Sequence, residues 1–362
     1  MPLESRGLRM TNRSTIKVLV VDDSAIVRKV LTEALSAEAD IEVVGTAPDP
    51  FVARDKILSL HPDVLTLDIE MPRMDGLTFL KKLMHYHPMP VIVISSLGAA
   101  STRVALDALE FGAIDVLAKP GGPHSAGELR VSLASKIRAA KIARLKTPAL
   151  PAVSPTAPPA RVPLAQPFPP SAVIAIGAST GGTEAIQKIL VELPENCPGV
   201  VITQHIPAVF SRSFANRLNE LCAIRVREAQ DGDKLEPGLA LVAPGNFHML
   251  LHRSASGYRV EVKDGPMVCF QRPAVDVLFH SVARSAGPWA TAAILTGMGS
   301  DGAQGMLAMK KAGARTIAQD EPTCVVFGMP REAIRIGAVD RVLPLDAIPS
   351  AVLSECRRCG NY

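Results

Sequence analysis

The chain has 362 residues, which suggests two domains and some connecting chain. Because 48% of the residues are hydrophobic and 20% are charged, the chain can bury two sizeable cores, and global disorder is excluded. Residues 1–146 contain 19 Lys and Arg against 17 Asp and Glu, and residues 147–362 contain 20 against 18. Neither half has the marked basic excess of a nucleic-acid-binding domain, so we expect no nucleic-acid partner.

Hydropathy and cysteine usage point to a cytoplasmic protein with no membrane insertion. No apolar run reaches the roughly 18 residues of a membrane span, and the polar N-terminus lacks the apolar core of a signal peptide. The six cysteines are irregularly spaced, which fits free thiols better than a disulfide framework. Cys356 and Cys359 form a C-x-x-C, but no second pair nearby would complete a zinc site, so we expect inert thiols.

Short β-branched runs alternate with helix-period segments in the first part of the chain, residues 16–140. The runs lie at residues 16–21, 41–44, 64–68, 91–95 and 115–118. This alternation predicts five βα units, and therefore a doubly wound parallel sheet with helices on both faces.

Residues 146–170 form the predicted boundary between two domains. They contain nine prolines in 25 positions, a density that disfavours helix and sheet and favours extended polyproline II. Such a linker could span up to roughly 75 Å, so the flanking domains could move or dock. Residues 171–354 repeat the α/β pattern, with a hairpin expected between residues 249 and 262. Strand runs are expected there at residues 172–177, 200–203, 239–244, 291–296 and 314–319.

Five polar residues follow the predicted strands of the first domain and converge on one edge of its sheet. They are Asp22, Asp23, Asp68, Ser95 and Lys119. Three carboxylates would repel one another without a hard cation, and Mg²⁺ prefers such oxygen ligands. An ammonium and a hydroxyl beside the metal suit phosphoryl transfer to a carboxylate. The alternative for Asp23 alone is that it caps the following helix.

This domain resembles the receiver domain of two-component response regulators, with its flavodoxin-like fold. The matching segments are VVDDSAIVRKV, LDIEMPRMDG, VISS and AKP, in the order and spacing of the family. The resemblance implies that Asp68 accepts the phosphoryl group and helps Asp22 and Asp23 to hold Mg²⁺. It also implies that Ser95 and Lys119 contact the phosphoryl group.

The second domain contains a candidate serine nucleophile on a glycine-rich turn. Ser179 lies in GASTGG between a predicted strand and a helix, where the flanking glycines allow close backbone approach. The alternatives are an ordinary Gly-rich turn or the phosphate cradle of a dinucleotide fold. The cradle requires an acidic residue at the end of the next strand, but that strand ends in Gln204-His205. A further strand ends before Asp301, so nucleophile, base and orienting carboxylate can share one edge.

Other histidines are weaker candidates for the base. His248 and His252 are expected in the hairpin, where they would not share a helical metal face. His280 follows Asp276 by four residues on a predicted helix, a spacing typical of a local surface pair.

Residues 172–353 resemble the catalytic domain of the chemotaxis-specific protein-glutamate methylesterases. The matching segments are GASTGG, QHI, LALVAPGNFHM, RPAVDVLFHSVA and LTGMGSDGAQGM, and a receiver joined by a linker completes that family's architecture. The resemblance implies Ser179 as nucleophile, His205 as base and Asp301 as orienter. It places Thr180 and the Met298 backbone N–H near the oxyanion. The order Ser, His, Asp distinguishes this hydrolase domain from the α/β-hydrolase fold.

The resemblance also implies the substrate, the partners and the cofactor. The substrates are glutamate methyl esters, and certain glutamines, on the cytoplasmic helices of chemoreceptors, and a chemotaxis histidine kinase donates the phosphoryl group. The receiver requires Mg²⁺, and no cofactor is expected in the catalytic domain. The runner-up is a response regulator whose second domain binds a nucleotide or a partner without catalysis.

Phosphorylation is expected to control the hydrolase through docking of the receiver. Val116 stands where many receivers carry an aromatic switch residue, which puts the usual aromatic rotation in doubt. We expect the surface beyond the fourth strand to dock over Ser179 and to block a helix-borne substrate. Phosphorylation of Asp68, which pulls on Ser95 and its loop, would then release the hydrolase.

Overall fold

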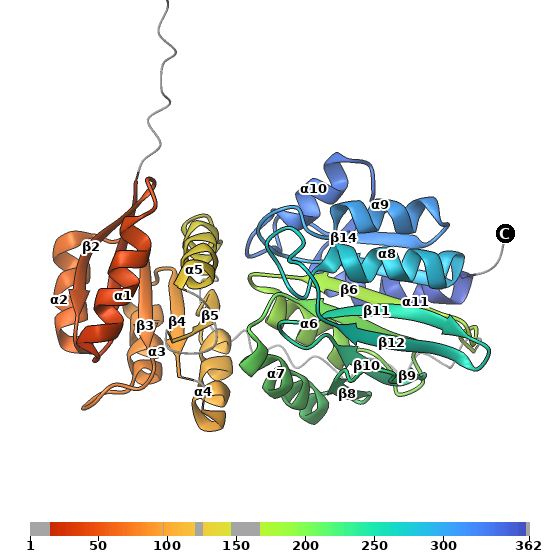
Figure 1. Ribbon diagram of the computed structural model, residues 1–362, viewed down its shortest axis with the longest axis horizontal. Helices are drawn as coiled ribbons and strands as arrows, with labels where there is room; N and C mark the ends of the chain where they lie inside the picture. Colours follow the sequence, from red (N-terminus) through yellow and green to blue (C-terminus); the bar gives the residue numbers. More distant parts are fainter. Residues whose placement is uncertain (1–14, 97, 120–125, 146–166, 360–362) are drawn as a thin grey trace, which may run out of the picture.

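The structure is a computed structural model that describes residues 15–96, 98–119, 126–145 and 167–359. Two α/β units lie side by side (Figure 1). Most of the predicted linker, residues 146–170, falls outside the described residues. Across the described ranges, no helix has both the length and the apolar character needed to cross a membrane.

The N-terminal unit is built on a five-stranded sheet. Its strands are β1 (Ile16–Val21), β2 (Ile41–Ala47), β3 (Val64–Asp68), β4 (Val91–Ser95) and β5 (Asp115–Ala118). They are parallel and follow the order β2-β1-β3-β4-β5, which is the flavodoxin-like order. All five predicted strands are confirmed. Because the strands are parallel, the ends of β1, β3 and β4 share one edge of the sheet.

Five helices cover the two faces of this sheet. They are α1 (Ala25–Ser36), α2 (Pro50–Leu60), α3 (Gly76–Tyr86), α4 (Ala99–Glu110) and α5 (Ala126–Lys141). Helices α1 and α5 pack on one face through leucines such as Leu31 and Leu133. Helices α2, α3 and α4 pack on the other face. The side chain of Ser24, not that of Asp23, caps α1 by accepting a hydrogen bond from the Val27 N–H, so the capping alternative for Asp23 is wrong.

The C-terminal unit contains a seven-stranded parallel sheet and a small antiparallel sheet. The parallel sheet has the order β15-β14-β13-β6-β7-β10-β8. Its strands are β6 (Val173–Ala178), β7 (Gly199–Gln204), β8 (Arg225–Glu228), β10 (Leu239–Val242), β13 (Ala290–Ile294), β14 (Arg315–Gln319) and β15 (Arg341–Leu343). The chain leaves β6 toward β7 on one side and later returns to β13 on the other. Ligand sites of open α/β sheets form at such a switch point.

Helices cover both faces of this sheet, because its central strands are buried on both sides. Ile174 and Ile176 of β6 pack toward α6 (Gly182–Val191), α7 (Ala208–Leu221) and α11 (Ile348–Arg358). The alternate residues Val173 and Ala175 pack toward the opposite helices, as a period of two requires. These are α8 (Val275–Ser285), α9 (Ala303–Lys311) and α10 (Met329–Arg335).

The predicted hairpin is confirmed as β11 (His248–Ser254) and β12 (Gly257–Lys263), which pair antiparallel. The two-residue strand β9 (Lys234–Leu235) pairs with β12 and completes the small sheet. Strands β8, β9 and β15 are missing from the prediction. They are short strands at the edges of their sheets, and they are rich in exposed charged side chains, so they lack the apolar run that identifies a strand.

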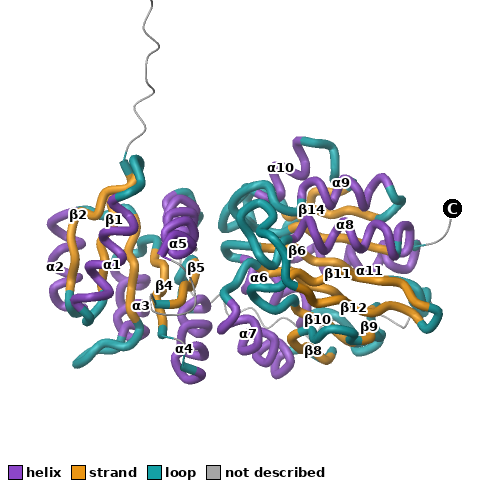
Figure 2. Tube along the Cα trace, in the orientation of Figure 1, coloured by secondary structure: helices purple, strands orange, loops and turns teal. Residues whose placement is uncertain are grey.

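The two units contact each other through α4 of the first and α7 of the second. Arg217 on α7 forms ion pairs with Asp107 and Glu110 on α4. Elsewhere, the backbone N–H of Arg144 donates a 2.9 Å hydrogen bond to the Val325 carbonyl. Figure 2 shows that many loops of the C-terminal unit gather on the side that faces the N-terminal unit.

Candidate functional site

Ser179 lies on a tight turn that joins β6 to α6. Its N–H donates to the Thr296 carbonyl at 3.0 Å, and its carbonyl accepts from the Gly182 N–H at 2.7 Å. Gly181 has φ of +77°, a conformation that favours glycine. A Cβ on Gly182 would lie 2.2 Å from the Gln204 side-chain oxygen, so only glycine fits there. The predicted role of the two glycines, close backbone approach at the turn, agrees with this geometry.

His205 and Asp301 form a buried pair at the same edge of the sheet. His205 follows β7, Asp301 lies in the loop after β13, and His205 Nε2 lies 2.7 Å from Asp301 Oδ2. The other ring nitrogen of His205, Nδ1, is buried and has no hydrogen-bond partner among the described residues. The backbone bond from the His205 N–H to the Ala178 carbonyl, 3.1 Å long, holds the histidine beside Ser179.

The first turn of α8 holds the carboxylate of Asp301. Its Oδ2 accepts from the Val275 N–H at 2.7 Å, and its Oδ1 accepts from the Asp276 N–H at 2.9 Å. Burial acts to raise the pKa of Asp301, but the hydrogen bonds from His205 and from these two N–H groups outweigh it and lower the pKa below its usual value. Asp301 is therefore ionised at neutral pH and can stabilise a positive imidazole.

The loop after β13 lies directly against Ser179, the candidate nucleophile. A Cβ on Gly297 would lie 2.6 Å from the Cβ of Ser179 and 2.4 Å from the sulfur of Met329, so this position has no room for a side chain. The next residue is Met298, whose N–H was predicted near the oxyanion. Thr180 is buried beside the nucleophile, and its carbonyl accepts a 3.0 Å hydrogen bond from the Thr296 hydroxyl.

The predicted acidic cluster of the first domain is present. One carboxylate oxygen each from Asp22, Asp23 and Asp68 lie within 4.8 Å of one another. Lys119 Nζ lies 2.7 Å from Asp68 Oδ2 and 3.2 Å from Asp22 Oδ2. Burial raises the pKa of Asp68 to about 6, the hydrogen bond from Lys119 opposes this rise, and the charge of Asp22 adds to it.

Ser95 ends β4 and is fully buried. Its hydroxyl lies 3.3 Å from the carbonyl of Ser101 on α4, and its own carbonyl accepts from the Lys119 N–H at 2.8 Å. Glu70, two residues after Asp68, accepts hydrogen bonds from the hydroxyls of Ser96 and Ser101. The sequence reasoning missed Glu70, because a glutamate in a loop has no distinctive spacing.

One buried contact joins the candidate hydrolase site to the N-terminal unit. The hydroxyl of Thr180 donates a 2.9 Å hydrogen bond to Oδ2 of Asp115, the first residue of β5. Asp115 Oδ1 forms a 2.6 Å ion pair with Lys136 on α5. Sequence reasoning placed Asp115 only in a strand. Its role at the interface depends on docking, which local patterns do not encode.

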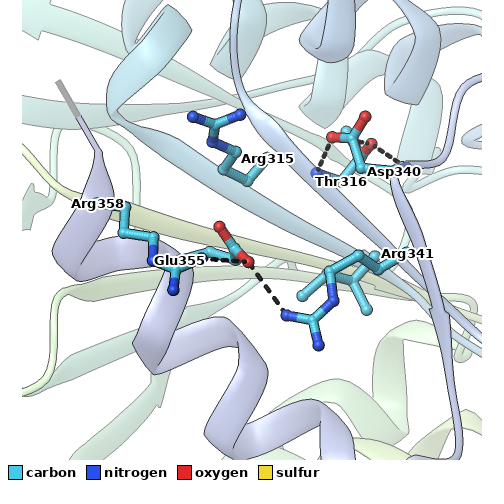
Figure 3. A pocket seen from close by; sticks show the side chains of 7 residues that line it. Arg315, Thr316, Asp340, Arg341, Glu355 and Arg358 are labelled. Atoms are coloured by element: carbon cyan, nitrogen blue, oxygen red, sulfur yellow. Dashed lines mark hydrogen bonds and ion pairs between the residues drawn. The ribbon is translucent and has the colours of Figure 1, made fainter. Parts of the chain in front are cut away.

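A pocket of about 290 Å³ lies away from these residues (Figure 3). Arg315 and Arg341, which line it, are the first residues of β14 and β15, so it opens at the amino ends of the strands. Ser179, His205 and Asp301 follow the carboxyl ends. Glu355 forms ion pairs with Arg341 at 3.1 Å and with Arg358 at 3.9 Å. We interpret this network as a set of ion pairs that holds the C-terminal helix α11 against the sheet.

Cys356 and Cys359 are buried at the end of α11. Both sulfur atoms contact the hydroxyl of Thr291, at 3.4 and 3.7 Å. This packing is that of structural thiols, and the expectation that they are inert stays a prediction.

Comparisons with known proteins decide the family. Residues 174–352 match the family model of CheB methylesterase, and residues 18–128 match that of the response regulator receiver domain. A protein-glutamate methylesterase/protein-glutamine glutaminase from Syntrophus aciditrophicus is 56% identical over 341 residues, covering 94% of this chain and 99% of the relative. This chain belongs to the receiver-linked CheB methylesterase family. The family has relatives in several bacteria, and one from Anaeromyxobacter dehalogenans is 57% identical over 96% of both chains.

A solved structure supports the same assignment for the C-terminal unit. The CheB methylesterase catalytic domain of Thermotoga maritima is 38% identical and superposes with a TM-score of 0.50, covering 51% of this chain and 98% of that one. The predicted fold class, two doubly wound α/β domains, is confirmed for this CheB-family chain.

Proposed function

We propose that this chain is a phosphorylation-regulated serine hydrolase. It removes methyl groups from glutamate esters on the cytoplasmic helices of chemoreceptors, deamidates certain glutamines there, and so adapts chemotaxis or a related chemosensory pathway. The observation that carries the proposal is the buried His205–Asp301 pair, 2.7 Å apart, beside Ser179 on a strand-to-helix turn. The names of the relatives agree with this activity.

The chemistry is acyl transfer at a side-chain carbonyl. Ser179 Oγ attacks the ester carbon, and its proton passes to His205 Nδ1, the ring nitrogen that has no partner. Asp301 at Nε2 stabilises the imidazolium that forms. The C–O bond to the methoxy group then breaks, and methanol leaves with the proton from His205. Water attacks the acyl-serine in the same way and releases the glutamate. With glutamine, ammonia replaces methanol.

Thr180 and Met298 are the proposed oxyanion donors. Thr180 directly follows Ser179, just before α6, and Met298 directly follows Gly297, whose close approach to Ser179 supports this assignment. Donors fixed where negative charge develops contribute about 3 to 4 kcal/mol each to transition-state stabilisation. Nothing in this mechanism requires a cofactor in the catalytic domain.

The receiver domain is proposed to hold Mg²⁺ through Asp22, Asp23 and Asp68. These residues fit the ion, because their oxygens cluster within 4.8 Å and the carboxylates of Asp22 and Asp68 are buried. When bound, Mg²⁺ would neutralise charge on the incoming phosphoryl group. Asp68 accepts this group from a chemotaxis histidine kinase, and Lys119 and Ser95 contact its oxygens.

Phosphorylation is proposed to relieve a block of the active site by the receiver. The hydroxyl of Thr180 is already engaged by Asp115, and helix α4 is anchored to α7 by Arg217. The N-terminal residues of α4 lie beside Ser95 and Glu70, so a change at Asp68 can reach the interface. Because the proposed substrates and the proposed kinase are cytoplasmic, we infer that the protein acts in the cytoplasm.

The experiment is to incubate the full chain with a methyl-esterified receptor fragment and to measure methanol. Methanol should appear faster when Mg²⁺ and a small phosphodonor are present. In parallel, mass spectrometry should show glutamine converted to glutamate at particular positions. Absence of both products, with the receptor fragment folded and methylated, would contradict the proposed function.

A further inference from the structure

Three exposed apolar side chains lie on two loops that border the triad. Phe247, Met267 and Phe270 are 43%, 46% and 79% exposed, and we call them the apolar patch. Single exposed apolar residues are normal on a protein surface, whereas a group of them beside an active site indicates a contact surface.

The two loops are joined to each other by hydrogen bonds. The Asn246 N–H donates to the Arg272 carbonyl at 3.1 Å. His248 Nε2 lies 2.9 Å from the Pro266 carbonyl, and His248 Nδ1 accepts from the Ala274 N–H at 3.3 Å. The residues that flank Phe247 are therefore fixed against the loop that carries Met267 and Phe270.

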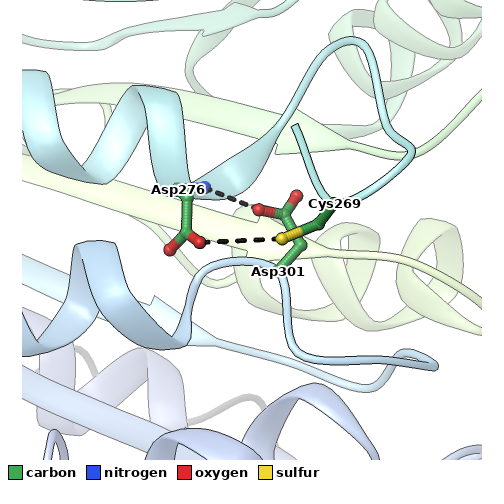
Figure 4. Close-up of side chains that lie close together, drawn as sticks. All are labelled: Cys269, Asp276 and Asp301. Atoms are coloured by element: carbon green, nitrogen blue, oxygen red, sulfur yellow. Dashed lines mark hydrogen bonds between the residues drawn. The ribbon is translucent and has the colours of Figure 1, made fainter. Parts of the chain in front are cut away.

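The loop that carries Phe270 lies against the triad carboxylate. Figure 4 shows Cys269, its neighbour in the chain, beside Asp276 and Asp301. The sulfur of Cys269 and one carboxylate oxygen of each aspartate lie within 4.8 Å of one another. Phe270 thus directly follows a residue whose sulfur lies close to the carboxylate of Asp301.

This loop is held rigidly in a conformation that exposes Phe270. Val268 and Gln271 pair with each other through two backbone hydrogen bonds of 3.1 and 2.9 Å. Arg272 anchors the end of the loop by donating to the Gly265 carbonyl at 2.6 Å. Cys269 and Phe270 both have positive φ, 51° and 61°, which is unfavourable for residues other than glycine. Because Phe270 buries little surface within the chain, the folded domain gains little by holding it there.

A pocket of about 200 Å³ is lined in part by Cys269. Its lining includes Ser300, Gln304, Glu332 and Arg335. The surface near Asp301 therefore carries charged side chains of this pocket as well as the exposed side chains of the apolar patch. This mixture matches a partner with one apolar and one polar face.

We propose that the apolar patch seats the apolar face of an amphipathic receptor helix while its esterified glutamate enters the active site. This inference rests on the proposed function. Side chains three and four residues apart lie on one face of a helix, so residues on either side of the ester can contact the patch together. The patch governs substrate binding and leaves the acyl transfer itself unchanged.

The test compares two substrates of the full chain in the presence of Mg²⁺ and phosphodonor. One is a methyl-esterified receptor helix fragment, and the other is the γ-methyl ester of N-acetylglutamate amide, which is too small to reach the patch. The variant is Phe247→Ala/Phe270→Ala. We expect its KM for the receptor fragment to rise about 10-fold or more, because two apolar contacts are lost. Its kcat on the fragment, and its kcat/KM on the small ester, should stay within about twofold of wild type.

The matched control is Tyr86→Ala, since Tyr86 is an aromatic residue of similar exposure, 80%, on α3 of the receiver. It should leave all constants unchanged. An unchanged KM in the double variant would overturn the inference, and so would an equal loss on both substrates, which would indicate a distorted triad. If the wild-type chain releases no methanol from the fragment, the proposed function itself fails.

Discussion

The hydroxyl of Thr180 donates a 2.9 Å hydrogen bond to Oδ2 of Asp115, and this bond links the residue after the nucleophile to the receiver. Both residues are buried, so water does not compete for the bond. A hydroxyl that is committed to Asp115 does not donate to the carbonyl oxygen of a substrate. The docked receiver therefore engages a proposed oxyanion donor, in addition to the block of access proposed above.

Loosening the contact between the domains should raise the activity of the unphosphorylated chain. Arg217→Glu places a like charge against Asp107 and Glu110, so the docked state loses attraction and gains repulsion. We expect methanol release from a methylated receptor fragment to rise about 10-fold without phosphodonor, and further stimulation by phosphodonor to shrink.

Arg212→Glu is the control for this charge reversal. Arg212 lies on the same helix, is 73% exposed, and pairs with Glu228 of its own domain. It should leave the basal rate unchanged. A lower rate in Arg217→Glu than in wild type would mean that the receiver contact activates the hydrolase.

Loss of the proposed nucleophile or base should abolish methanol release and leave the fold intact. Ser179→Ala and His205→Ala each remove a proton-transfer partner, and losses in turnover for such residues can reach about 10⁶-fold. Asp301→Asn should cost about 10⁴-fold, because the amide favours the wrong histidine tautomer. Circular dichroism checks the fold. If Ser179→Ala retains more than a tenth of the wild-type rate, the serine mechanism is wrong.

Phosphorylation of Asp68 should require Mg²⁺. The carboxylates of Asp22, Asp23 and Asp68 crowd one site, and Lys119 supplies one positive charge against Asp22 and Asp68. A further anion can approach only after a cation binds. Labelling by a radioactive small phosphodonor should appear with Mg²⁺, disappear with a chelator, and be absent in Asp68→Asn. Acid-stable labelling of that variant would instead identify a serine or threonine as acceptor.

Replacement of Asp276 should stabilise the catalytic domain at neutral pH. Burial raises the pKa of Asp276, the Gly305 N–H only partly opposes this, and the charge of Asp301 adds to the rise. The folded state therefore binds this proton more tightly than the unfolded chain. The resulting stabilisation is complete below about pH 3.8 and is lost as the pH rises through the pKa of the folded state.

At neutral pH, the buried ionised carboxylate of Asp276 thus lowers the free energy of unfolding. Asp276→Asn removes this charge, while the oxygen of the asparagine amide can still accept from the Gly305 N–H. We expect a higher Tm for the variant at pH 8 by calorimetry, with a difference that shrinks as the pH approaches 4. Asp346→Asn, at a position that is 84% exposed, should show no such trend. A pH-independent difference would show that ionisation is not its cause.

The sequence predicted those parts of the protein that depend on local pattern. Buried runs such as 64–68 and 91–95 match the strands β3 and β4 residue for residue, because parallel strands buried on both faces are continuously apolar. The candidate residues at the strand ends could also be predicted, because the carboxyl ends of parallel strands lie at the same edge of a sheet. The edge strands and the Glu70 contacts escaped prediction, since exposed charged segments have no hydrophobic period.

The contact of Thr180 with Asp115 and the apolar patch escaped prediction for another reason. They depend on how segments far apart in the chain dock against each other. The positive φ of Cys269 and Phe270 could not be predicted either, since neither residue type favours that conformation.

Strand β5 is a rigid element that connects the proposed phosphorylation site to the proposed hydrolase site. Asp115 at its start holds Thr180, and Lys119 directly after its end holds Asp68. Four residues of strand span about 13 Å, and β5 is paired with β4 along its whole length. A small displacement at the phosphorylation site can therefore move Asp115 as part of the same backbone. Val116 between them is buried and needs no rotation for this. An enzyme with such a strand would transmit its signal as a shift of main chain, and it would tolerate the loss of an aromatic switch.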